Sequence, residues 1–258
     1  MENENEIYKY QRLVMNLIID IGNTLIKLVV FDNKNQLLDL TYSSHKSVLD
    51  NIKKQHDKYN FSAAILSKVG KNITGLSQLL TTLNIPLINI SPTIKLPFEI
   101  AYQTPETLGA DRLALVAGAL YHQKNKNQLI IDAGTCVTYD FVDDNNIYHG
   151  GSISPGLQLR FKSLNDYTAN LPLITANDEK IDWIGKNTKS SIKTGVIWGL
   201  IHEIEGFSVK YNLKYPDLTV YLTGGDEKLL DRYIKNKIFV NSKFLLWEGM
   251  NYLLNINK

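Results

Sequence analysis

Two short stretches of this 258-residue chain carry almost the same residues. Residues 17–24 read LIIDIGNT, and residues 129–136 read LIIDAGTC. Each is an apolar run typical of a buried strand, and each ends in an acid and a glycine turn. Glycine lets the backbone approach a ligand closely, and the threonine that follows offers a hydroxyl and a backbone N–H. Two such turns that face each other can hold a polyphosphate, and their acids can hold a hydrated Mg²⁺.

A single turn of this kind is also a common hairpin feature, so the prediction of a phosphate site rests on the repeat. The chain has no Gly-x₄-Gly-Lys-Ser/Thr motif, which argues against a P-loop enzyme. It has no Gly-x-Gly-x-x-Gly motif either, which argues against a Rossmann site. The five histidines are scattered without metal-ligand spacing, and nothing supports a hydrolase triad.

The composition is that of an ordinary globular protein, with 44% hydrophobic and 21% charged residues. A formal charge of +2 gives no electrostatic argument for nucleic-acid binding. Cys136 is the only cysteine, so an intrachain disulfide is impossible. No apolar run approaches the roughly 20 residues that span a bilayer, and the polar N-terminus is unlike a signal peptide. We therefore expect a cytoplasmic protein with neither a nucleic-acid nor a membrane partner.

The elements that position the two turns are expected in the same order in both halves. Three strands come first, and helices then alternate with strands, which mixes antiparallel hairpins with parallel crossovers. A long helix is expected at about 109–123 and another from 186 to about 211. The pattern predicts an α/β fold of two duplicated ribonuclease-H-like domains with a cleft between them. We expect an N-terminal extension at 1–15, without chemistry, and domains at 16–127 and 128–258.

The doubled Asp-x-Gly-Thr turn resembles the actin-like ATPase, sugar-kinase and acetate-kinase superfamily. Within it, the sequence is similar to type III pantothenate kinases over nearly the whole chain after Met15. The blocks that carry the resemblance are DIGNTLIK at 20–27, GADR at 109–112, DAGTCVTYD at 132–140, GGSISPG at 150–156 and GKNT at 185–188, with TGGD at 223–226 in support. The order and spacing of the blocks are much more specific than any one of them.

The resemblance implies an enzyme that uses ATP with Mg²⁺ to phosphorylate pantothenate to 4'-phosphopantothenate, the first step of coenzyme A biosynthesis. It implies ATP contacts at Asp20, Gly22, Asn23, Thr24, Lys27 and Thr135. It implies a monovalent cation, K⁺ or NH₄⁺, at Asp132. Pantothenate would be bound by Tyr102, Gly109, Ala110, Asp111, Arg112 and Thr188, with Asp111 as the proton acceptor. Thr188 would lie at a subunit boundary, which implies a homodimer.

Plainer alternatives exist for several of these residues. Asp111 could merely cap a helix, Lys27 could be a solvated charge, and Tyr102 could be a packing residue. TGGD could be an ordinary strand-ending turn that takes no part in adenosine binding. Cys136 stands where a small residue such as alanine is expected, so we expect a buried small side chain, which could make the ATP site sensitive to thiol reagents. Gly195 and Gly199, four residues apart, indicate close helix packing, for which a dimer interface is one candidate place.

Two alternative functions stay open at this point. A protein of this fold could bind nucleotide as a non-catalytic regulatory accessory factor. A regulator has no need to keep four charged site residues together, whereas this chain has Asp20, Asp111, Arg112 and Asp132. A kinase of the same superfamily could also act on a sugar or an acid, and only the resemblance of GADR and Tyr102 argues against it.

Overall fold

The structure is a computed structural model that describes residues 15–22, 25–176, 181–234 and 239–258. Its contacts divide the chain into two compact units that interleave along the sequence. The first unit contains residues up to Pro97, Thr104–Gly118 and Leu246–Lys258, and the second contains Phe98–Gln103 and Ala119–Leu245. The expected boundary between residues 127 and 128 refers to the duplicated halves of the sequence and stays a prediction.

The first unit is built on a five-stranded sheet in the order β3-β2-β1-β4-β5. Strands β1, β2 and β3 form an antiparallel meander, whereas β4 and β5 extend the sheet in parallel from β1. Helix α2 connects β3 to β4, and α3 connects β4 to β5, as parallel strands require. The bounds are β1 Met15–Ile21, β2 Ile26–Phe31, β3 Leu37–Ser43, α2 Val48–Tyr59, β4 Phe61–Lys68, α3 Leu76–Thr82 and β5 Leu87–Asn89.

The second unit repeats this arrangement in a sheet of order β11-β10-β7-β8-β9-β6. Strands β7, β8 and β9 are antiparallel, and β10 and β11 follow in parallel from β7. The same strand order in both sheets confirms the predicted duplicated α/β architecture. The bounds are β6 Glu99–Ile100, β7 Gln128–Ala133, β8 Cys136–Val142, β9 Ile147–Pro155, α5 Leu157–Asp166, α6 Thr188–Lys214, β10 Thr219–Thr223, α7 Glu227–Asp231 and β11 Phe239–Asn241.

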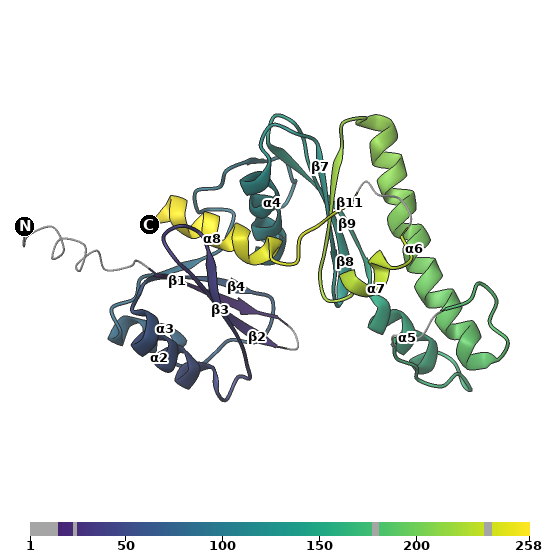
Figure 1. Cartoon of the computed structure of the whole chain (residues 1–258), viewed down its shortest axis with the longest axis horizontal. Helices are drawn as coiled ribbons and strands as arrows, with labels where there is room; N and C mark the ends of the chain where they lie inside the picture. Colours follow the sequence, from purple (N-terminus) through teal and green to yellow (C-terminus); the bar gives the residue numbers. More distant parts are fainter. Residues whose placement is uncertain (1–14, 23–24, 177–180, 235–238) are drawn as a thin grey trace, which may run out of the picture. The chain divides into compact units, whose positions relative to one another are not determined.

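The first sheet buries both faces of its strands β1 and β2 almost completely. Side chains alternate between the faces of a strand, and Leu17, Ile19 and Ile21 pack against apolar residues of α2 and α3. Figure 1 shows α2 and α3 on one face of this sheet and α8 (Leu245–Asn257) on the other. The side chains of Asn16 and Asp20 lie on the α8 face, so the acid of the first predicted phosphate turn points away from the main apolar cluster.

The bounds of the two long helices agree closely with those predicted from the sequence. Two short elements and the C-terminal helix were not predicted. Helix α4 spans Ala110–His122, and α6 spans Thr188–Lys214. The two-residue strand β6, which pairs in parallel with β9, and the 3₁₀ turn Pro105–Thr107 have too few residues for a periodic pattern. Helix α8 was not predicted either. Across the described residues, no helix is both long and apolar enough to cross a membrane.

Candidate active site

The first repeated turn holds a buried acid near the end of β1. Oδ2 of Asp20 accepts a hydrogen bond from Nζ of Lys27 at 3.0 Å. The same oxygen accepts a second hydrogen bond from Nε1 of Trp247 at 3.2 Å. Asp20 and Trp247 are 5% and 7% exposed, so both contacts are shielded from bulk water. Two donors on one oxygen fix the carboxylate, and the lysine offsets its charge.

Glycine backbone makes the first turn compact. The N–H of Gly22 donates to the carbonyl of Leu25 at 3.2 Å. Gly70, just after β4, lies against the turn so closely that an added Cβ would sit 2.7 Å from the carbonyl oxygen of Gly22. A side chain at Gly70 would therefore have to displace backbone, and one at Gly22 would make a tight contact of 3.2 Å with the carbonyl oxygen of Leu25. Asn23 and Thr24, the two predicted ATP contacts at the tip of this turn, lie outside the described residues.

The second repeated turn occupies the equivalent place in the second sheet. Asp132 is the penultimate residue of β7, as its counterpart is of β1. The N–H of Gly134 donates to the carbonyl of Cys136 at 3.0 Å, and that of Gly156 donates to the carbonyl of Thr135 at 3.1 Å. A Cβ at Gly156 would overlap the carbonyl oxygen of Gly134. The last glycine of GGSISPG is therefore needed for close packing against the turn.

The TGGD block packs on the same turn. Gly224 has a φ of +105°, which favours glycine, and a Cβ there would lie 2.5 Å from Oδ1 of Asp132. The N–H of Asp226 donates to the carbonyl of Ala133 at 3.0 Å. Burial raises the pKa of Asp226 from 3.8 to about 6. The second turn thus lies beside a carboxyl that resists ionisation.

The two acids differ in what lies next to them in the sheet. The neighbour of Asp20 on β2 is Lys27, whereas the neighbour of Asp132 on β8 is Thr138. Oγ1 of Thr138 is buried and has no hydrogen-bond partner among the residues that the structure describes. The first turn therefore has a lysine beside its acid. The second turn has a hydroxyl oxygen there, which can accept a hydrogen bond or coordinate a cation.

The expectation that Cys136 is a buried small side chain is wrong, because its side chain is exposed. Cys136 is the first residue of β8, directly after the turn, and Thr135 before it is exposed as well. The end of the strand leaves both residues open to solvent. Thr135 is thus accessible to a ligand, as an ATP contact must be.

The GADR block forms the start of α4. Oδ1 of Asp111 accepts a hydrogen bond from the backbone N–H of Arg112 at 2.8 Å. A Cβ at Gly109 would overlap the same carboxylate oxygen, so the glycine makes room for it. The dipole of α4 favours the ionised form of a carboxyl in its first turn. Ala110 is the first residue of the helix, and Arg112 is buried. This geometry suits a helix cap and a proton acceptor equally well.

Tyr102 lies directly against the first glycine of GGSISPG. Gly150 has a φ of +91°, and a Cβ there would sit 2.5 Å from Cδ2 of Tyr102. The ring is partly exposed. Gly150 therefore provides the space that Tyr102 occupies. This contact explains why a glycine is needed at the start of GGSISPG.

Thr188 is the exposed first residue of α6, and the GKNT block fixes where this helix begins. Oδ1 of Asn187 accepts a hydrogen bond from the N–H of Ser190 at 2.9 Å, and Oγ of Ser190 accepts one from the N–H of Asn187 at 3.0 Å. This reciprocal capping box satisfies two N–H groups at the helix start. A Cβ at Gly185 would overlap the backbone of Ser191, so the glycine lets the loop fold onto the helix.

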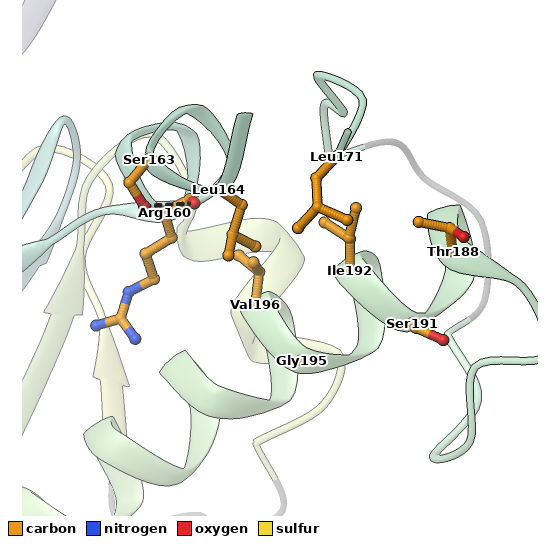
Figure 2. Close-up of a pocket in the computed structure, with 9 residues that line it drawn as sticks. All are labelled: Arg160, Ser163, Leu164, Leu171, Thr188, Ser191, Ile192, Gly195 and Val196. Carbon is orange, nitrogen blue, oxygen red and sulfur yellow. Dashed lines mark hydrogen bonds between the residues drawn. The ribbon is translucent and has the colours of Figure 1, made fainter. Parts of the chain in front are cut away.

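A pocket of about 750 Å³ opens between α5 and α6. Figure 2 shows Thr188 and Ser191 at one end and apolar side chains from both helices across its middle. It is lined by Arg160, Ser163, Leu164, Leu171, Thr188, Ser191, Ile192, Gly195 and Val196. One predicted substrate residue therefore lies at a real concavity with an apolar centre.

A polar cluster that the sequence did not indicate holds one wall of this pocket. Nη2 of Arg160 donates to Oε2 of Glu203 at 2.5 Å and to Oγ of Ser154 at 2.9 Å. The hydroxyl of Tyr139 donates to Oε1 of Glu203 at 2.8 Å. Burial alone would raise the pKa of Glu203, but the hydrogen bonds from Arg160 and Tyr139 outweigh it and lower that pKa. The cluster ties α5 and α6 to β8 and β9.

The described site residues form groups within the two units. Asp20, Gly22 and Lys27 belong to the first unit, together with the GADR block. Tyr102, Asp132, Thr135 and Thr188 belong to the second. Trp247 is a site neighbour that could not be predicted from the sequence, because nothing local links it to Asp20, 227 residues away.

Comparisons with known proteins point to one family. The sequence profile of the type III pantothenate kinase family matches residues 16–210. A protein of Christiangramia forsetii named type III pantothenate kinase is 45% identical over 245 residues, which cover 95% of this chain and 99% of that one.

Solved structures share the fold. A Campylobacter jejuni protein named as a candidate Baf family transcriptional activator matches with a TM-score of 0.60 and 22% identity, over 93% of this chain and 98% of that one. A glucokinase from an Antarctic psychrotroph matches with a TM-score of 0.52 and 11% identity, over 94% and 99% of the two chains. At these identities the matches show the two-domain ribonuclease-H-like fold alone.

Proposed function

The chain belongs to the type III pantothenate kinase family, and we propose that it catalyses the ATP-dependent phosphorylation of pantothenate to 4'-phosphopantothenate, the first step of coenzyme A biosynthesis. The observation that carries the proposal is the 45% identity to a relative of that name over nearly the full length of both chains. The two acid-glycine turns at equivalent places in duplicated sheets support it, because phosphoryl transfer depends mainly on positioning and on charge stabilisation.

The ATP phosphates are assigned to the two turns. Asp20, Gly22 and Lys27 supply a fixed carboxylate, a close backbone approach and a cation, and Thr135 supplies an exposed hydroxyl. Asn23 and Thr24 are assigned to the same role from the sequence. Asp20 can hold the Mg²⁺ that accompanies ATP, directly or through water, and the metal would neutralise charge on the phosphates.

Pantothenate is assigned to the residues around α4, Tyr102 and Thr188. Asp111 would accept the proton of the pantothenate hydroxyl, and the guanidinium of Arg112 suits the substrate's carboxylate. Gly109 and Ala110 would provide backbone contacts at the helix start. The partly exposed ring of Tyr102 and the pocket beside Thr188 support their assignment as substrate contacts.

A monovalent cation at Asp132 is part of the proposal. Within the described ranges, no three His, Cys, Asp or Glu side chains gather as a site for a multivalent metal. Asp132 with the orphaned Oγ1 of Thr138 beside it is a weak oxygen set that fits K⁺ or NH₄⁺. Such an ion would offset repulsion between the aspartate and a bound nucleotide, as Lys27 does for the acid of the first turn.

A homodimer and a cytoplasmic location complete the proposal. Thr188 is exposed at the end of a pocket whose floor includes Gly195, so a second copy could approach it closely. ATP, the phosphoryl donor, is supplied in the cytoplasm. The structural neighbour with a regulatory name is only 22% identical, so it gives the regulatory alternative no support.

The decisive assay is ATP consumption with pantothenate, compared with glucose, N-acetylmannosamine and acetate, with mass spectrometry of the product. We expect turnover with pantothenate alone and a product heavier by one phosphoryl group. Turnover with a sugar or an acid but not with pantothenate would assign the chain to another kinase class. ATP binding without turnover of any acceptor would favour the regulatory alternative.

A further inference from the structure

Helix α8 and the residue that follows it, at the C-terminal end of the chain, are joined to β1 by polar contacts. Nδ2 of Asn16 donates to Oδ1 of Asn251 at 2.6 Å, and Nζ of Lys258 donates to Oδ1 of Asn16 at 3.1 Å. Asn16 and Asn251 are 1% and 2% exposed. Buried amides must find partners of the right geometry, so these contacts fix the position of α8 along the strand.

The same helix packs on the backbone of α4. A Cβ at Gly249 would overlap the carbonyl oxygen of Ala114 and would lie 2.6 Å from the N of Gly118. Glycine is required here by the close approach of two helices. Ala114 is one turn after the start of α4, where Asp111 lies. Helix α8 therefore contacts β1 and α4, two of the elements of the first unit that carry predicted site residues.

We propose that Trp247 is a positioning residue for the carboxylate of Asp20, which would hold the Mg²⁺ of bound ATP. Its indole N–H and the ammonium of Lys27 both hold Oδ2, and the helix that carries the indole is seated on α4. Among the described residues, no hydrogen bond reaches Oδ1 of Asp20. With Oδ2 held, Oδ1 has one direction in which to meet the Mg²⁺ of bound ATP or a water molecule of that ion. The inference rests on the proposed role of Asp20 in ATP binding.

The chemistry of the contact predicts which kinetic constants depend on it. A hydrogen bond to a carboxylate is stronger than one between neutral groups, and losing it frees the carboxylate to rotate. Displacement of a group at the phosphates by about 1 Å can cost up to a hundredfold in rate. The substrate contacts of α4 and Tyr102 are not part of this hydrogen bond, so the constants for pantothenate should change little.

The test compares Trp247→Phe with a matched control, Trp198→Phe. Phenylalanine keeps the aromatic bulk and removes the N–H. The indole N–H of Trp198 is buried and has no hydrogen-bond partner among the described residues, so its loss removes packing area alone. We expect kcat/KM for Mg·ATP to fall about tenfold or more in Trp247→Phe, with KM for pantothenate within about twofold. The control should stay within about twofold of wild type in both.

The kinetic outcomes separate positioning from stability. A Trp247→Phe protein that melts like wild type and has wild-type kcat/KM for Mg·ATP would overturn the inference. An equal loss in both variants would show a structural effect only and would overturn it too. A wild-type protein that fails to bind Mg·ATP in calorimetry would refute the proposed role of Asp20 itself, which is a different result.

A spectroscopic readout needs no activity. The chain has three tryptophans, so ¹⁵N-labelled indoles give three N–H signals, and Trp247→Phe identifies the one that belongs to Trp247. We expect Asp20→Asn to shift this signal upfield in the protein without nucleotide, because a neutral acceptor forms a weaker hydrogen bond. The other two signals should not move. An unshifted Trp247 signal would show that the contact is absent and would overturn the inference.

Discussion

Asp226 should contribute more to the stability of the protein in acid than at neutral pH, and replacing it should remove that contribution to the pH dependence. Burial raises the pKa of this carboxyl from 3.8 to about 6. A group whose pKa is higher in the folded state binds its proton more tightly there. Its contribution to folding is therefore fully present below pH 3.8, and it is lost as the pH rises through about 6.

The size of the effect follows from the shift. About two pKa units at 1.36 kcal/mol each correspond to about 3 kcal/mol as an upper bound. The side chain is only half-buried, so solvent screening reduces this to about 1–2 kcal/mol. We expect Asp226→Asn to be more stable than wild type by that amount at pH 7.5. In a chain of this length, this raises Tm by roughly 2–8 °C.

Calorimetric unfolding at pH 7.5 and pH 4.0 measures the difference directly, in sodium buffers without nucleotide. At pH 4.0 most of the advantage of Asp226→Asn should vanish, because the wild-type carboxyl is then protonated in the folded protein. Asp217→Asn, at an exposed position just before β10, is the matched control and should show no such pH dependence. If the difference between Asp226→Asn and wild type is the same at both pH values, burial does not perturb this carboxyl and the reasoning is wrong.

Four further predictions test the proposed site. Asp111→Asn should lower kcat about a hundredfold or more with nearly unchanged ATP binding and Tm, whereas early melting with normal turnover per folded molecule would make Asp111 a helix cap. Activity should require K⁺ or NH₄⁺ and fall sharply in Na⁺ alone; equal rates in the three salts would remove the cation from Asp132. Gly150→Ala should raise KM for pantothenate about tenfold or more, because its Cβ displaces Tyr102, and an unchanged KM would leave that ring a packing residue. Light scattering should give a mass of twice 29.3 kDa, and a fully active monomer would contradict a dimer-completed site at Thr188.

Periodic and repeated features of the sequence predicted the framework. The strand before each repeated turn, the three-strand meanders and the helices from Ala110 and Thr188 have patterns that depend on neighbours within a few residues. The duplicated strand order then follows from the duplicated turns. Gly150 and Gly156 were recognised as members of a motif. Their packing against the ring of Tyr102 and the backbone of Gly134 was not predicted.

Contacts between distant segments of the chain could not be predicted from the sequence. The partner of Asp20 at Trp247 and the partner of Asn16 at Asn251 are more than two hundred residues away, and no local pattern encodes such pairs. Cys136 was wrongly predicted to be buried, because the alternation of apolar and polar residues along β8 does not show where solvent reaches the end of the strand. The roles of Asp111 and Asp132 stay predictions, since a carboxylate at a helix start or strand end serves several purposes.

The position of α8 has a consequence for how the protein is made. Domains generally fold as units while the chain leaves the ribosome, from the N-terminus onward. Here the first unit cannot be completed first, because its last helix is synthesised after every residue of the second unit. Until then the face of β1 that carries Asn16 and Asp20 lacks its cover. The nascent chain must keep this face in solution for the entire synthesis of the second unit, and a stop codon before Trp247 would leave it exposed for good.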